Sequence, residues 1–314
     1  MTCNLGFKPI LVTVLLLSLP ILVRSQQEPA FPATPVKVVV AAEARHAKDV
    51  PQIRAEDVIV MQAKQRQKVI AWQAIASSQF GAQLFVLIDD SLSSSDLGSK
   101  LNDIRGFINS QPATVQAGIA YMRNGTALIT QSLTNDHGKA AKALRLPIGD
   151  SGASASPYFS LQDLLKHWPQ DNAARELIMI TDGIDAYWDS NSLDDPYVNS
   201  AIEQAQRQGV VVNAIYARGD GHMGHTFWRI NSGQNFLSEV ADATGGEAYY
   251  LANDSPVAFT PYFNELTERM KHQYLLTFEA QPGRKSEFQP IKVGTEVPNV
   301  DLVAPNRLYV PTGS

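Results

Sequence analysis

The chain has 314 residues, of which 44% are apolar, and its formal net charge is −5 at pH 7. An apolar fraction of this size supports a buried core and excludes a globally disordered chain. The acidic balance, without runs of Lys and Arg, gives no basis for nucleic-acid binding, which requires a basic patch.

The N-terminal residues have the pattern of a secretory signal peptide. Lys8 precedes an apolar stretch, Ile10 to Val23, and the residues that follow predict cleavage after Ser25. The stretch is shorter than the roughly 20 residues that a membrane-spanning helix needs, although an uncleaved anchor is an alternative. Cys3 would be lost with the signal, so the mature chain would contain no disulfide. We therefore expect a secreted, periplasmic or cell-envelope protein with no membrane span beyond this segment.

The next expected elements are a Pro-rich linker, strands, and then an alternation of strands and helices. The linker covers 26–35, and short strands are predicted at 36–40, 57–60 and 68–72. Continuous apolar runs at 84–88, 177–181 and 210–216 indicate strands buried on both faces. A hairpin is expected from strands 115–122 and 127–130, with its turn at Asn124 and Gly125. Helices are predicted at 96–109, 136–144, 157–167, 198–208, 236–243 and 259–270, and a short strand at 247–251.

This alternation predicts an α/β fold with a doubly wound, mainly parallel sheet covered by helices on both faces. The tail has only strand-like pieces, at 274–278, 290–293, 300–303 and 307–310. We expect them to pair with the N-terminal strands in a small sandwich-like satellite. The predicted organisation is a signal peptide (1–25), a linker and N-terminal β unit (26–78), the α/β domain (79–272) and a C-terminal β segment (273–314).

Oxygen-bearing side chains follow two of the buried strands. Asp89, Ser91 and Ser93 come after the strand at 84–88, and Asp182 follows the strand at 177–181. In extended chain, alternate residues point the same way, and the carboxyl ends of parallel strands meet at one edge of the sheet. Oxygen ligands select a hard divalent cation, with Mg²⁺ as the first choice and Ca²⁺ or Mn²⁺ as alternatives.

The motif D-x-S-x-S after one buried strand, with T-D-G after another, resembles the metal-ion-dependent adhesion site of the von Willebrand factor type A (VWA) domain. The resemblance covers about residues 80–272, and the flanking β segments resemble an acidobacterial-type group of secreted VWA proteins. It implies a metal site at Asp89, Ser91, Ser93 and Asp182, together with a loop Thr. The metal would be completed by an acidic group from a protein partner.

The expected loop Thr is missing, and the segment 152–157 occupies its place. Ser156 is the better substitute as the fifth ligand, and Ser154 the weaker one. Because Pro157 suits the first helical turn, the alternative for Ser156 is a plain helix cap. Asp90 is expected to point away from the site into solvent. The acidic residues after Asp182 are interpreted as a solvated turn, or as an acidic rim for a basic partner; they are Asp185, Asp189, Asp194 and Asp195.

Other chemistry has weaker support. The loop 219–224 matches G-x-G-x-x-G, but a dinucleotide site needs a helix that begins there, and the next expected helix begins near Phe236. His222 and His225 are interpreted as loop residues that could shape partner access. No G-x-S-x-G elbow and no base near the metal are found, so no catalytic residue is assigned. The prediction is a secreted protein-binding module. The alternatives are a structural envelope module with a vestigial metal site and, last, a metal-dependent hydrolase.

Overall fold

The structure is a computed structural model that describes residues 1, 32–45, 49–77, 81–149, 156–169, 171, 173–188, 194–219, 226–251 and 254–312. The chain divides into a short unit, Met1–Ala30, and a main unit, Phe31–Ser314, to which the following description applies. Apart from Met1, the predicted signal peptide lies outside the described residues, as do Ser154, Asp189, His222 and His225.

The centre of the main unit is a six-stranded sheet. Its strand order is β10-β9-β8-β5-β6-β7, and all neighbouring pairs are parallel except the antiparallel hairpin β6–β7. Asn124 and Gly125 have positive φ angles of 50° and 72°, which a two-residue turn of this hairpin requires. The strands are β5 (Ala82–Asp89), β6 (Val115–Arg123), β7 (Thr126–Thr134), β8 (Ala174–Thr181), β9 (Val210–Tyr216) and β10 (Ala248–Tyr249).

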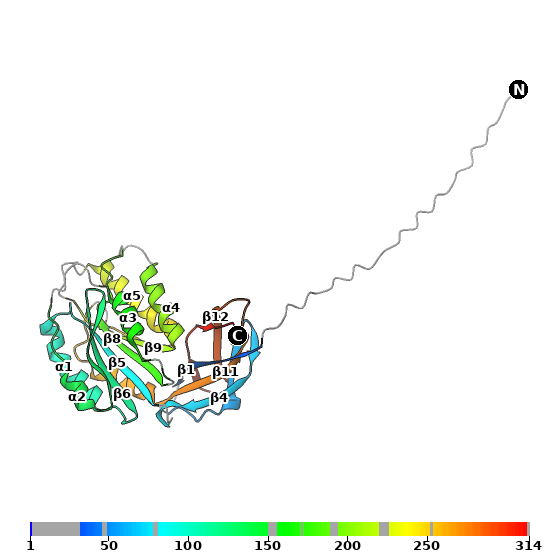
Figure 1. The fold of residues 1–314 in the computed structure, drawn as a ribbon, viewed down its shortest axis with the longest axis horizontal. Coiled ribbons are helices and arrows are strands. Elements are labelled where there is room, and N and C mark those ends of the chain that lie inside the picture. Colours follow the sequence, from blue (N-terminus) through cyan, green and yellow to red (C-terminus); the bar gives the residue numbers. More distant parts are fainter. Residues whose placement is uncertain are drawn as a thin grey trace. The chain divides into compact units, whose positions relative to one another are not determined.

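Helices cover both faces of this sheet, as Figure 1 shows. One face packs against α1 (Ser94–Asn109), α2 (His137–Lys142) and α6 (Thr260–Lys271). The other packs against α3 (Pro157–His167), α4 (Pro196–Gln208) and α5 (Phe227–Thr244). Alternate residues of β5, such as Val86 and Leu87, enter the two opposite cores. The predicted doubly wound α/β fold is confirmed.

Helix α5 corrects one prediction, because it begins at Phe227 and not near Phe236. Thr226 caps it by accepting a hydrogen bond from the backbone N–H of Arg229 at 3.4 Å. Its buried face includes the small or polar residues Ser232, Gly233 and Gln234. These residues interrupt the apolar periodicity from which a helix is recognised in sequence.

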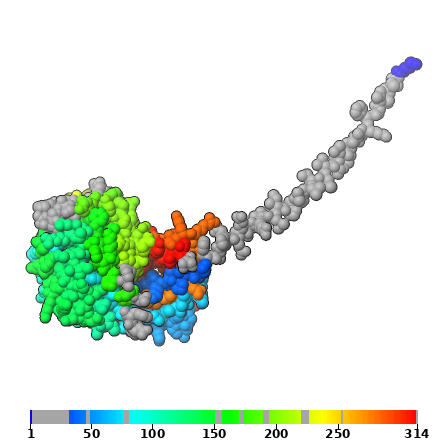
Figure 2. Space-filling model, in the orientation of Figure 1, coloured from blue at the N-terminus to red at the C-terminus, as the bar shows by residue number. Residues whose placement is uncertain are grey.

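The remaining strands form two antiparallel four-stranded sheets, β13-β1-β11-β4 and β14-β12-β2-β3, around a separate apolar core. In Figure 2 the blue N-terminal and orange-to-red C-terminal segments lie together beside the α/β domain. The predicted pairing of the chain's two ends is therefore confirmed, and only β3 was not predicted. The strands are β1 (Thr34–Ala44), β2 (Val58–Gln62), β3 (Gln65–Gln67), β4 (Val69–Ala74), β11 (Gln273–Ala280), β12 (Glu287–Thr295), β13 (Val300–Val303) and β14 (Arg307–Val310), with short 3₁₀ turns at Ala55–Asp57 and Ile75–Ser77.

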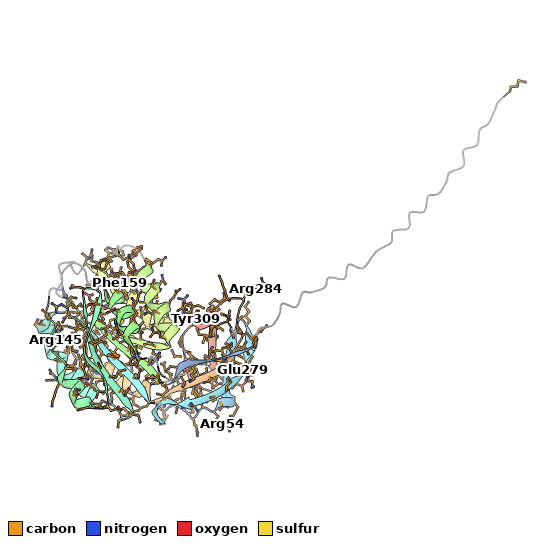
Figure 3. All side chains as sticks on the ribbon, in the orientation of Figure 1. Arg54, Arg145, Phe159, Glu279, Arg284 and Tyr309 are labelled. Carbon is orange, nitrogen blue, oxygen red and sulfur yellow. The ribbon has the colours of Figure 1, made fainter. Side chains whose placement is uncertain are left out.

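These two four-stranded sheets form a β-sandwich, which packs at the amino ends of the central strands. Gln273 at the start of β11 donates a hydrogen bond to the buried Glu176 of β8 at 2.7 Å. The guanidinium of Arg207, at the end of α4, lies 3.9 Å from the ring centre of Tyr309, which is labelled in Figure 3. The carboxyl ends of the strands therefore face away from the sandwich. No helix in the described ranges combines the length and the apolar composition needed to cross a bilayer.

Candidate metal centre

The candidate site lies where the helical crossovers diverge. Strands β5 and β8 are parallel neighbours, with α1 after β5 on one face of the sheet and α4 after β8 on the other. Asp89 is the last residue of β5, and Asp182 directly follows β8. Ligands of open α/β sheets bind in this crevice beyond the carboxyl ends. The fold thus brings the two predicted carboxylates to one place.

Asp89 is buried and held by three hydrogen bonds. Its Oδ1 accepts from the Ser91 backbone N–H at 2.9 Å and from the Ser91 hydroxyl at 2.6 Å. Its Oδ2 accepts from the Thr181 hydroxyl at 2.7 Å. Burial raises the pKa of Asp89, while these donors act in the opposite direction.

Asp182 lies at the same edge of the sheet. Its Oδ1 accepts a hydrogen bond from the Ile184 backbone N–H at 2.9 Å. Burial, followed by repulsion from the neighbouring charge of Asp89, raises the pKa of Asp182 to about 7. A bound cation would relieve the repulsion between two such neighbouring carboxylates.

Ser91 and Ser93 stand at the start of α1. The Ser93 hydroxyl caps the helix by accepting from the Asp96 backbone N–H at 3.4 Å, and it lies 3.0 Å from the Ser95 hydroxyl. The backbone N–H of Ser93 donates to the carbonyl of Arg218 after β9. A hydroxyl oxygen has two lone pairs, so both serines retain acceptor capacity for a metal.

The hydroxyl of Ser156, the predicted fifth ligand, makes two hydrogen bonds. It is the N-cap of α3, and its hydroxyl accepts from the Phe159 backbone N–H at 3.3 Å. The same hydroxyl donates its hydrogen to Asp185 Oδ2 at 2.7 Å. The cap interpretation is confirmed, and a role as metal ligand remains a prediction that would use the second lone pair.

The expectation that Asp90 is solvated is wrong. Asp90 is 1% exposed and forms a bidentate ion pair with Arg145, at 2.6 and 2.8 Å. Its Oδ1 also accepts from the Ile148 backbone N–H at 3.2 Å. The guanidinium of Arg145 (Figure 3) also lies 3.8 Å from the ring centre of Tyr121 in β6, so the ion pair is packed against the sheet. A buried carboxylate needs such a partner.

The interpretation of the following acidic residues as a solvated turn is also wrong for two of them. Asp185 is buried and accepts from Ser156 and from the Tyr187 backbone N–H at 2.7 Å. Asp195 is buried as the N-cap of α4, where it accepts from the Tyr197 backbone N–H at 2.8 Å. Both order the backbone around the crevice, and Asp194 is exposed.

The donor set at this edge fits a hard cation. Asp89 and Asp182 provide carboxylate oxygens, and Ser91 and Ser93 provide hydroxyl oxygens, which suit Mg²⁺, Ca²⁺ or Mn²⁺. The described ranges contain no group of three or more His, Cys, Asp and Glu side chains placed to hold a metal. Two carboxylates would balance the charge of a bound divalent ion, and the neutral hydroxyls would add none, so a coordination position could remain open to a further oxygen ligand.

Two neighbours of the site were not predicted. Thr181 was identified as the end of a buried strand and the first residue of T-D-G and was given no role of its own, yet its hydroxyl joins β8 to Asp89. Gly219 was considered only as part of a glycine-rich loop. A Cβ at residue 219 would lie 2.6 Å from Asp182 Oδ2, so any other residue here would require this carboxylate to shift. The signal for Thr181 was its position directly before Asp182.

Comparisons with known proteins found structural likeness only. No family model matches the sequence, and neither does any curated protein. Among solved structures, a protein described as von Willebrand factor type A from Catenulispora acidiphila is 12% identical, with a TM-score of 0.45, over 90% of this chain and 74% of that one. BatB from Bacteroides thetaiotaomicron is 13% identical, with a TM-score of 0.42, over 60% and 97%. An aerotolerance-related membrane protein from Bacteroides fragilis is 14% identical, with a TM-score of 0.44, over 60% and 98%.

The doubly wound sheet carries D-x-S-x-S and T-D-G at its carboxyl edge, the two motifs on which the sequence resemblance to the VWA domain rests. The chain thus has a central domain with a VWA-like, doubly wound α/β fold, and its two ends form an additional β-sandwich. The narrower resemblance to acidobacterial-type secreted proteins remains a prediction. At these identities and TM-scores, the similarity concerns the fold and gives no information about bound metals or partners.

Proposed function

We propose that this protein is an exported binding module that holds a divalent cation, Mg²⁺ in the first instance, and uses it to bind an acidic group of a protein partner. The observation that carries the proposal is the placement of Asp89 and Asp182 at the carboxyl ends of β5 and β8, which are neighbouring parallel strands. The cation would be held by these carboxylates with Ser91 and Ser93, and Ser156 remains the proposed fifth ligand.

Few anionic ligands leave the cation able to attract a foreign carboxylate. The binding then needs no turnover, and no group in the described crevice is assigned as a general base. Non-catalytic binding is accordingly part of the proposal. A broad hydrolase substrate screen, with Asp182→Ala as the inactive reference, would contradict it by finding turnover that this substitution abolishes.

Isothermal titration of the full chain with Mg²⁺ and Mn²⁺ tests the site. Wild-type protein is expected to bind one ion, and Asp89→Ala to lose that binding. Asp136→Asn is the matched control, because it removes a carboxylate from the N-cap of α2 and asparagine caps a helix equally well. Equal metal binding by wild type and Asp89→Ala would refute the site.

One observation favours a second candidate function, a structural interaction module with a vestigial site. The hydroxyl hydrogen of Ser156 is donated to Asp185, and the loop Thr of the family pattern is missing. This candidate predicts partner binding that is unchanged by EDTA. A pull-down with purified protein in Mg²⁺ and in EDTA separates the two functions.

Export through residues 1–25 completes the proposal. The support is the sequence pattern alone, a basic residue, an apolar stretch and a cleavage position after Ser25. N-terminal sequencing of the protein recovered from its native cells should begin at Gln26. Recovery of an intact N-terminus from the interior of the cell would contradict export.

A further inference from the structure

A cleft lies between the α/β domain and the sandwich, on the side of helices α4 and α5. Its volume is about 880 Å³, which is within the range of small-molecule sites, and such sites often lie at the junction of two parts of a chain. Figures 1 and 2 show α4 next to the red C-terminal strands that form the far wall. Polar side chains that line the cleft include Asn235, Ser238, Glu239 and Asp242 of α5, Tyr250 after β10 and Asn306 before β14.

Helix α5 forms the near wall with a stripe of polar side chains. Asn235, Ser238, Glu239 and Asp242 stand at positions i, i+3, i+4 and i+7, which places them on one face of the helix. Val240, which lies between them in sequence, is buried in the core. A polar helix face toward open water needs no explanation. This stripe instead faces a second wall, which the sandwich provides.

Hydrogen bonds between the sandwich and α4 hold the far wall in place. Gln206 Nε2 donates to Asn306 Oδ1 at 3.2 Å, and Arg307 Nε donates to Gln206 Oε1 at 2.8 Å. Arg307 also lies 3.7 Å from Glu203, which balances its charge. Because Asn306 accepts from Gln206 through its oxygen, both of its amide N–H groups are left to donate to a ligand.

The near wall is available to a ligand. Within the described ranges, the side chains of Asn235, Ser238, Glu239 and Asp242 form no hydrogen bond and no ion pair. Tyr250 is 44% exposed, and its hydroxyl likewise has no partner in these ranges. These groups therefore do not hold the fold together, although they gather along one cleft.

The chemistry of these groups defines the ligand. Carboxylates such as Glu239 and Asp242 only accept hydrogen bonds, whereas amides and hydroxyls both donate and accept. Burial, and then repulsion from Asp194 and Asp195, raise the pKa of Glu239, so the cleft disfavours an anionic ligand. An ammonium group carries donors only and would leave the amide N–H groups without an acceptor. A neutral, hydroxyl-rich molecule suits both kinds of group, since a hydroxyl donates one hydrogen bond and accepts two.

We propose that this cleft binds a neutral oligosaccharide. The sugar hydroxyls would donate to Glu239 and Asp242 and accept from Asn235 and Asn306, and the C–H face of a pyranose ring would pack on the ring of Tyr250. None of these residues belongs to the candidate metal centre. The inference therefore goes beyond the proposed function and does not use the cation.

The test applies the labelled full chain to an array of defined neutral glycans and measures each hit by isothermal titration. Wild-type protein should bind at least one oligosaccharide, and the double variant Asn235→Ala, Asp242→Ala should bind it at least about tenfold more weakly, because two hydrogen bonds are lost. Alanine favours the helix and removes no described contact, so this variant should fold as wild type. Asn102→Ala, Glu268→Ala is the matched control, because both positions are exposed on α1 and α6, which cover the other face of the sheet.

Four results would overturn the inference. The first is that no glycan binds, and the second is equal binding by wild type and the double variant, which would place the sugar elsewhere. The third is binding that is lost in EDTA and in Asp89→Ala, which would place the sugar at the metal centre. The fourth uses spermine as a cationic probe: spermine binding that Glu239→Gln abolishes, without binding of any glycan, would make the cleft a site for cations. Titration of wild type and Asp89→Ala with Mg²⁺ tests the proposed function separately.

Discussion

The hydroxyl of Thr181 donates a hydrogen bond to Asp89 Oδ2 at 2.7 Å and thereby links the ends of the two central strands. The Thr181 hydroxyl oxygen also accepts a hydrogen bond from the Gly183 backbone N–H at 3.2 Å. Thr181 therefore orients Asp89, one proposed metal ligand, and holds the turn that contains Asp182, the other carboxylate ligand.

Replacing Thr181 with valine should weaken Mg²⁺ binding by about tenfold to a hundredfold, since partners that orient metal ligands contribute this much. Thr181→Ser keeps the hydroxyl and should bind nearly as wild type. Calorimetric titration of both variants measures the effect. Valine keeps the γ-methyl group and lacks only the hydroxyl, so wild-type affinity in Thr181→Val would contradict the role of the hydrogen bond.

Gly219→Ala should lower the affinity for Mg²⁺, because its Cβ would meet Asp182 Oδ2 at 2.6 Å and displace the carboxylate. The control is Gly106→Ala in α1, where a Cβ would have no neighbour within 4 Å. That variant should keep wild-type metal affinity and gain about 0.5–1 kcal/mol of helix stability. Unchanged affinity in Gly219→Ala would place the metal away from Asp182.

Arg145→Ala should lower the free energy of unfolding by about 3 kcal/mol, because it leaves the buried Asp90 without its ion-pair partner. The exposed pair of Arg54 with Glu56 offers a control, and Arg54→Ala should change stability by no more than about 0.5 kcal/mol. Urea unfolding of the three proteins makes the comparison. A similar small effect at both arginines would contradict the structural role of the Asp90 pair.

Glu176 predicts a pH dependence at the other end of the sheet. Burial raises the pKa of Glu176 to about 7, from 4.5 in its reference state, although Gln273 and Asn213 donate to it. The folded state therefore holds this proton more tightly than the unfolded state. Stability from this group is full below the unfolded pKa, falls as pH rises from about 4.5 to 7, and is constant above that. The total loss is about 3 kcal/mol.

Glu176→Gln should abolish that loss, so the variant should exceed wild type in unfolding free energy at pH 8 and differ little at pH 4.5. Gln273 can turn its amide to accept from the new side chain. Glu268→Gln, at a well-exposed glutamate, should leave the pH slope as in wild type. Urea unfolding across this range measures the slopes, and parallel curves for Glu176→Gln and wild type would refute the assignment.

The strands were largely predictable because their residues carry the signal locally. The apolar run of β9 predicted its bounds, and Ser156 with Pro157 predicted the start of α3. The helix predicted at 236–243 was too short. The first half of α5 buries small and polar residues where it passes Asp182, so that half has no apolar periodicity. That close approach is a tertiary requirement and leaves no periodic pattern.

The site was predictable as far as local motifs extend. Asp89 and Asp182 follow buried strands, so the fold class brings them together. Their supporting contacts were not predictable. Arg145 binds Asp90 from the segment after α2, which is distant in sequence, and Asp185 binds Ser156 from a different loop. Such pairings depend on how the loops pack in the folded protein. They leave no repeat or regular spacing in the sequence from which they could be predicted.

The pairing of β1 with β11 and β13 has a mechanical consequence. The α/β domain is inserted between β4 and β11, and these two strands are themselves hydrogen-bonded to one another. A pull applied between Thr34 and Val310 would therefore load the ladders of the sandwich first. The inserted domain stands outside that line of tension, so its carboxyl edge keeps its geometry until the sandwich ruptures.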